Sequence, residues 1–189
     1  MAAWDDIPDD EKPFQRRLME VAAGFGEHVD VQVGRLNDEL EALGYADNTL
    51  FVYIWGDNGS SGEGQNGTIS ELLAQNGIPT TVRQHIDALD ELGGLDVLGS
   101  PLVDNQYNAA WAWAGSTPYK GMKLMASHLG GTRNPLAVRW PVSASTGCHA
   151  AGRSQKSFWG SITSSWMLRA MVFSLVCGCS VILLVQKIN

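Results

Sequence analysis

The stretch LFVYIWGDNG, residues 50–59, joins a continuous apolar run to a polar turn. The run is rich in aromatic and β-branched residues and lacks alternation of polar and apolar positions, which is typical of a strand buried on both faces. Such strands occur mostly in parallel sheets that helices cover on both sides. The stretch therefore predicts an α/β fold, with a largely parallel sheet flanked by helices.

A long amphipathic helix is predicted before this strand. Apolar residues recur every three or four positions from Phe14 to Leu43, which is the period of a helix with one buried face. Asp9 and Asp10 are suitable caps near its start, and Gly44 is placed as its left-handed stop. We expect this helix to pack on the sheet.

Further elements are predicted after the polar turn. Residues 81–92 have the pattern of a helix that ends at Gly93-Gly94, and residues 136–141 read as a strand that a proline stops. The remainder of residues 59–115 is expected to form a long excursion over the carboxyl end of the sheet. Residues 1–141 thus form a partial α/β domain, and residues 142–165 are unassigned.

The composition is that of a globular protein. The chain has 189 residues, of which 44% are hydrophobic and 17% are charged, and its formal net charge is -7. No run of Lys and Arg appears, which argues against nucleic acid as a partner. All three cysteines lie in the last quarter, and Cys177 and Cys179 are too close in sequence for a zinc knuckle. Neither a nucleic-acid-binding site nor a zinc site is expected.

The two ends of the chain differ in character. The N-terminus has neither a basic region nor an apolar core, so no secretory signal peptide is predicted. The tail at residues 166–186 contains a long uncharged apolar run and approaches the roughly 20 residues that span a bilayer. It is a candidate transmembrane helix, although a run of this size also suits a buried helix. The expected location is the cytoplasm, or a membrane reached through the tail.

Asp57 and Asn58 stand at the carboxyl end of the predicted strand. Ligands of open α/β sheets bind at this edge, and carboxylate and amide oxygens suit calcium or magnesium. Two ligands are too few for a protein site, so other residues must complete it. Asp-Asn-Gly is also a common turn, and a purely structural role is the alternative.

Lys123 and His128 precede a Gly-Gly turn. A lysine ammonium near a divalent cation would help to hold a sulfate-like group. A histidine nearby could donate a hydrogen bond or a proton. On chemistry alone, a solvated lysine and a histidine without a role form the simpler interpretation.

Two blocks of sequence together resemble the bacterial arylsulfatases of the sulfatase and alkaline phosphatase superfamily. The first block consists of four short segments, residues 19–25, 33–36, 47–50 and 56–59. The second consists of Thr117-Pro118-Tyr119 and of the run KLMASHLGGTRNP, residues 123–135. The resemblance covers roughly residues 3–141. It implies an alkaline phosphatase-like fold, incomplete at both ends, and the hydrolysis of sulfate esters.

The resemblance also assigns roles to individual residues. Members of this family bind a calcium ion that grips the sulfate, and the ligands in their D-N-G turn correspond to Asp57 and Asn58. The lysine before their A-S-H-x-G-G-T-R run contacts the sulfate and corresponds to Lys123. His128 lies within that run and is expected to neighbour the substrate. A sulfate ester is thus the implied small-molecule partner, and calcium is the implied cofactor.

The sequence departs from the family pattern at the nucleophile. Family members use a formylglycine made from the first residue of a C/S-x-P-x-R motif, which does not occur among these 189 residues. The paired N-terminal aspartates that complete the calcium site are also absent. We therefore interpret the chain as a central fragment of an arylsulfatase. It is expected to be inactive alone, because covalent catalysis needs its nucleophile.

Two other interpretations stay open. A membrane-anchored, non-catalytic remnant would use residues 166–186 as its anchor. A phosphatase or phosphodiesterase of the same superfamily would use a similar metal scaffold, although the A-S-H-x-G-G-T-R run favours a sulfatase. The resemblance stops at residue 141, and our hypothesis is that a frameshift or rearrangement replaced the original continuation.

Overall fold

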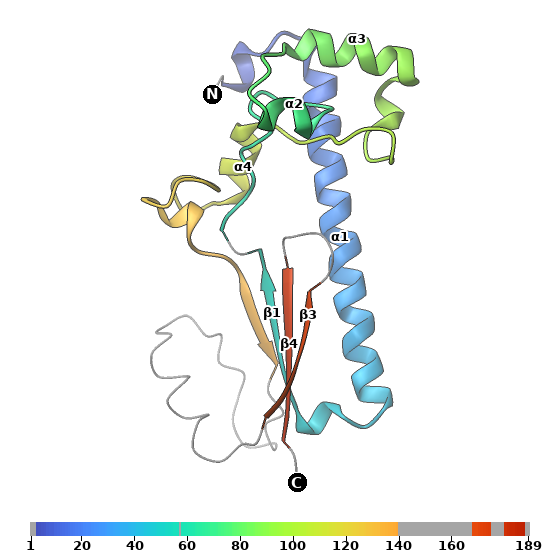
Figure 1. Ribbon diagram of the computed structural model, residues 1–189, viewed down its shortest axis with the longest axis vertical. Helices are drawn as coiled ribbons and strands as arrows, with labels where there is room; N and C mark the ends of the chain where they lie inside the picture. Colours follow the sequence, from blue (N-terminus) through green and yellow to red (C-terminus); the bar gives the residue numbers. More distant parts are fainter. Residues whose placement is uncertain (1–2, 57, 140–167, 175–179, 188–189) are drawn as a thin grey trace. The chain divides into compact units, whose positions relative to one another are not determined.

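The computed structural model of the chain divides into two compact units (Figure 1). It describes residues 3–56, 58–139, 168–174 and 180–187. The first unit comprises residues 1–32 and 57–134, and the second comprises residues 33–56 and 135–189. Each unit is therefore assembled from segments that lie far apart in the sequence.

The first unit is mainly helical. Its longest helix is the amino-terminal part of α1, which as a whole runs over Lys12–Ala42. The other described helices are α2 (Glu71–Gln75), α3 (Val82–Leu92) and α4 (Ala109–Gly115). Short 3-10 helices complete it, namely η1 (Trp4–Asp6), η3 (Gly94–Val97) and η4 (Leu129–Gly131). Long loops join these elements.

Helix α3 forms where the sequence predicted it. The hydroxyl oxygen of Thr81 accepts a hydrogen bond from the backbone N–H of Gln84 at 3.2 Å. The side-chain oxygen of Gln84 accepts one in return from the backbone N–H of Thr81 at 2.9 Å. This reciprocal capping begins the helix, and Gly93 ends it with a φ of 122°.

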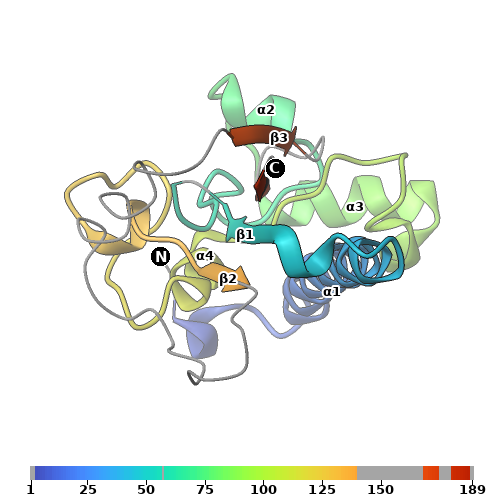
Figure 2. The same cartoon turned by 90° about the horizontal axis from the view of Figure 1, so that it is seen from below.

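The core of the first unit lies between α1 and α3. Figure 2 shows the ribbons of these two helices from below. Its fully or nearly buried residues are Phe14, Leu18, Ile86, Leu89 and Leu98. The sequence predicted that the apolar face of α1 packs on a sheet, but in this unit it packs on another helix. A helical period shows that one face is buried without identifying the element that covers it.

The second unit contains, among its described residues, a four-stranded sheet with the strand order β2-β1-β4-β3 (Figure 1). Its strands are β1 (Thr49–Trp55), β2 (Leu136–Arg139), β3 (Leu168–Ser174) and β4 (Ser180–Lys187). The short helix η2 (Ala46–Asn48) leads into β1. Gly44 follows α1 with a φ of 73°, as the predicted left-handed stop.

The predicted parallel arrangement of this sheet is not confirmed. Every pairing between described strands is antiparallel, and Phe51 of β1 lies opposite Arg139 of β2 and Leu184 of β4. The first four residues of β1 are buried, as predicted, and exposure rises toward Trp55. A buried strand carries an apolar run whatever the direction of its neighbours, so the run did not determine that direction.

Two described segments of the apolar tail form strands, where the sequence offered a candidate transmembrane helix or a buried helix. β3 and β4 lie in this part of the chain, and β4 pairs with β1 from Thr49 to Trp55. Val, Ile and Leu suit both kinds of element, so a short apolar run does not distinguish them. Within the described residues, no helix combines the length and the apolar character needed to cross a bilayer. Residues 142–165 lie outside the described residues.

Candidate active site

Two loops of the first unit carry the predicted site residues. We call residues 58–64 the strand-end loop and residues 120–134 the lysine loop. The backbone N–H of Lys123 donates a hydrogen bond to the carbonyl oxygen of Ser60 at 2.9 Å. The backbone N–H of Gly59 donates one to the side-chain oxygen of Asn134 at 3.1 Å. These two hydrogen bonds join the strand-end loop to the lysine loop, one at Lys123 and the other at Asn134.

Glycines allow the backbones of these two loops to touch. Gly59 has a φ of 89°, and a Cβ atom there would lie 2.0 Å from the carbonyl oxygen of Gly130. A Cβ atom on Gly130 would in turn lie 2.2 Å from the carbonyl oxygen of Gly121. No side chain fits at Gly59, so the contact between the two loops, which we call the loop junction, depends on glycine there. Glycine at Gly130 lets the lysine loop fold closely on itself beside this junction.

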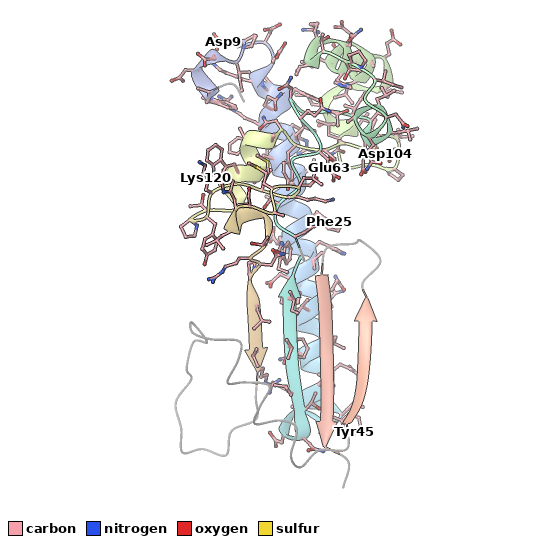
Figure 3. The ribbon with its side chains drawn as sticks, turned by 60° about the vertical axis from the view of Figure 1, so that its left-hand side comes forward. Asp9, Phe25, Tyr45, Glu63, Asp104 and Lys120 are labelled. Atoms are coloured by element: carbon pink, nitrogen blue, oxygen red, sulfur yellow. The ribbon has the colours of Figure 1, made fainter. Side chains whose placement is uncertain are left out.

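An ion pair crosses the loop junction. The ammonium nitrogen Nζ of Lys123 donates to the Glu63 carboxylate oxygen Oε2 at 2.7 Å, and the two side chains are 28% and 22% exposed. The hydroxyl of Ser61 donates to the same oxygen at 2.9 Å. The hydrogen bond from Lys123 lowers the pKa of the Glu63 carboxyl below its ordinary value, against the opposing effect of burial. Figure 3 labels Glu63 on the strand-end loop and Lys120 on the lysine loop.

The four predicted site residues fare differently. Asp57 lies outside the described residues, and Asn58 is exposed on the strand-end loop. Lys123 is half-buried and adjoins that loop. His128 is also half-buried, and its Cβ atom packs against the backbone of Gly121 within the lysine loop. The structure thus joins Lys123 to the segment that carries Asn58, while the roles of all four residues stay predictions.

Sequence reasoning missed Glu63. Its partner Lys123 is 60 positions away, so no local pattern connects the two. The available signal was an acidic side chain between Gly62 and Gly64, in a loop that directly follows a candidate metal turn. An isolated charge in a glycine-rich loop is usually solvated, and only the fold shows its pairing.

The described residues provide part of a donor set for a metal ion. The amide of Asn58 is a hard oxygen donor of the kind that calcium takes, and its neighbour Asp57 would add a carboxylate. Over the described part of the chain, no group of three His, Cys, Asp or Glu residues could hold a metal ion. The donors fit calcium in kind, and further oxygen ligands would be needed to complete its coordination.

Comparison with known proteins identifies the family. The sequence model of the sulfatase family matches residues 3–162. An uncharacterised sulfatase of Schizosaccharomyces pombe (strain 972) is 31% identical over 139 residues, which are 74% of this chain and 23% of that protein. No solved structure matches the chain. The chain belongs to the sulfatase family.

Family membership has consequences for fold and chemistry. It implies an alkaline phosphatase-like α/β fold, and proteins of the sulfatase family typically bind a divalent metal ion. The chain spans 23% of the length of its S. pombe relative. The family match also runs to residue 162, past residue 141, where the sequence resemblance was expected to stop.

Proposed function

We propose that this chain supplies the sulfate-binding part of an arylsulfatase active site, with calcium held by Asp57 and Asn58. The observation that carries the proposal is the hydrogen bond between the Lys123 N–H and the Ser60 carbonyl oxygen at 2.9 Å. Ser60 is two residues after Asn58, so this bond joins the lysine backbone to the segment that bears the proposed metal donors. The loop junction therefore supports a shared role for the two motifs.

The proposed roles follow from the chemistry of the groups. A bound calcium ion would neutralise negative charge on the sulfate oxygens. The Lys123 ammonium donates hydrogen bonds to those oxygens, and its partial burial reduces the screening of its charge by water. His128 neighbours the ester and donates a hydrogen bond to it. The nucleophile is supplied from outside these residues, since the C/S-x-P-x-R motif does not occur in them.

Ligand binding by the purified chain tests this proposal. In calorimetric titrations with 4-nitrophenyl sulfate and calcium, Lys123→Ala is expected to weaken ester binding at least about tenfold, because a charge-assisted hydrogen bond is lost. Lys120→Ala is the matched control, since Lys120 is an exposed lysine on the same loop. Asp57→Ala and Asn58→Ala are expected to weaken calcium binding. Equal ester affinities of Lys123→Ala and the unchanged chain would overturn the proposal.

Hydrolysis provides a separate test of the nucleophile assignment. We expect the purified chain to release no 4-nitrophenol above the uncatalysed rate, because enzymes owe rate enhancements of at least about 10⁶-fold to complete active sites. The released phenol is followed by its absorbance. Turnover that both a chelator and Lys123→Ala abolish would show that the nucleophile lies within these residues after all.

A further inference from the structure

We propose that Glu63 is a positioning residue that holds the Lys123 ammonium and makes this site prefer monoanionic sulfate esters to dianionic phosphate esters. This inference rests on the proposed role of Lys123 in binding the sulfate. It concerns a residue whose partner is known only from the fold, through the 2.7 Å contact between Lys123 Nζ and Glu63 Oε2.

The backbone on both sides of Glu63 is held in place. A Cβ atom on Gly62 would lie 2.4 Å from the Met122 sulfur, and one on Gly64 would lie 2.1 Å from the Tyr107 carbonyl oxygen. Met122 directly precedes Lys123 and is buried. The loop that carries the carboxylate is thus packed against the residue next to the lysine, which fixes the separation of the two charged groups.

Hydrogen bonds also orient the Glu63 carboxylate. Its Oε2 atom accepts from both the Lys123 ammonium and the Ser61 hydroxyl. The Ser61 oxygen accepts in turn from the Glu63 backbone N–H at 3.4 Å. A carboxylate with two donors on one oxygen has little freedom to turn away from the ammonium. Glu63 therefore limits the positions that the Lys123 ammonium can reach.

The ion pair has a consequence for ligand charge. Sulfate and phosphate monoesters have the same tetrahedral shape, so shape discriminates weakly between them. At neutral pH the sulfate ester carries one negative charge, whereas a phosphate ester carries between about 1.5 and 2. The Glu63 carboxylate repels every negative charge that approaches Lys123, and this repulsion is larger for the dianion. A repulsive group is an effective way to reject a close analogue.

The affinity ratio for two matched ligands tests the inference. We compare 4-nitrophenyl sulfate with 4-nitrophenyl phosphate at about pH 8, where the phosphate ester is a dianion. Glu63→Gln is expected to shift the ratio about tenfold toward the phosphate ester, which corresponds to about 1.4 kcal/mol. Calcium is present for all variants, so its charge cancels in the comparison. An unchanged ratio in a folded Glu63→Gln chain would overturn the inference.

Two further variants separate local from general effects. Glu91→Gln makes the same change in net charge on an exposed site of α3 and is expected to leave the ratio unchanged. Glu63→Asp keeps the charge and is expected to keep the preference for the sulfate ester. A shift of the same size in Glu91→Gln would assign the preference to net charge, against a role for Glu63.

The failure of this inference is distinguishable from failure of the proposed function. If Lys123→Ala loses ester binding while Glu63→Gln leaves the ratio unchanged, only the role of Glu63 is wrong. If neither ester binds the unchanged chain, both proposals are wrong for it. Acetylation by acetic anhydride, followed by mass spectrometry, tests the positioning alone. Glu63→Gln should speed acetylation of Lys123 several-fold relative to Lys120, and equal relative rates would count against the pairing.

Discussion

The α1–α3 contact and the loop junction lie in the same unit but are held together by different forces. Between α1 and α3, apolar side chains such as Phe14 and Leu89 are 1% exposed and fill the space between the helices. At the loop junction, a Cβ atom on Gly59 would lie 2.0 Å from the carbonyl oxygen of Gly130, so two backbones meet there without side chains. Apolar burial stabilises the first contact, whereas hydrogen bonds and one ion pair link the second.

This difference explains why the candidate site lies at the loop junction. In the α1–α3 contact, packing uses the side chains, so none is available to bind a ligand. At the loop junction the glycines let backbone contact backbone. The side chains of Asn58, Glu63 and Lys123 therefore keep part of their surface accessible. A site needs polar groups that are both fixed and reachable, and a glycine-lined junction provides them.

The largest expected effect comes from breaking the apolar contact. Leu89→Ala removes a buried side chain from the α1–α3 core and should lower the free energy of unfolding by about 2–5 kcal/mol. Chemical denaturation measures this change. Leu92→Ala, on the same helix but 49% exposed, should cost far less. Equal losses for the two variants would show that α3 does not pack as described.

An intermediate effect is expected from breaking the loop junction. A Cβ atom on Gly130 would overlap the carbonyl oxygen of Gly121, so Gly130→Ala should lower the free energy of unfolding by about 1–3 kcal/mol. It should also weaken binding of the aryl sulfate, because the lysine loop must shift. Denaturation and calorimetric titration measure the two changes.

A glycine in open space is the control for this prediction. Gly24 lies in α1, and a Cβ atom there would meet nothing within 4 Å. Gly24→Ala should therefore raise stability by about 0.5–1 kcal/mol, since alanine favours a helix over glycine. If Gly130→Ala were as stable as Gly24→Ala and bound the ester unchanged, the close approach of Gly130 to Gly121 within the lysine loop would be wrong.

The parts of the fold that the sequence predicted are those with local signals. The Thr81 cap and Gly93 bracket α3, Gly44 ends α1, and a continuous apolar run marks β1. Each signal depends only on residues that are close in the sequence, so it can be recognised without knowledge of the fold. The choice of partner is what local signals left open, because a pattern shows that a face is buried and not which element buries it. The antiparallel sheet and the packing of α1 on α3 are of this kind.

The candidate site divides in the same way. Lys123 and Asn58 became candidates because each belongs to a run that resembles a family motif, and the family match supports that resemblance. Glu63 was missed because its meaning depends on a partner 60 residues away. The close approach of Gly59 to Gly130 is equally non-local. Both contacts are properties of the folded chain, and no spacing in the sequence predicts them.

The smallest predicted effect is a change of stability with pH, caused by a buried titratable side chain on α3. His85 is 5% exposed, and its Nε2 atom lies 2.9 Å from the Thr80 hydroxyl oxygen. Burial lowers the pKa of His85 below its ordinary value. As the pH falls below about 6.5, the unfolded chain therefore binds a proton before the folded chain does, and stability declines. The free energy of unfolding should therefore be lower at about pH 5.5 than at about pH 7.5.

Replacement of the imidazole tests this pH dependence. His85→Gln keeps a polar group beside Thr80 but cannot titrate in this range, so its unfolding free energy should fall less than that of the unchanged chain as the pH is lowered. His28→Gln, at an exposed position of α1, is the control for the loss of an imidazole outside α3. If denaturation curves of His85→Gln follow the unchanged chain at both pH values, the folded chain accepts the proton as readily as the unfolded one. Water would then reach the charged imidazole on α3. The α1–α3 contact would in that case be less tightly packed than the burial of His85 indicates, and it would differ less from the accessible loop junction.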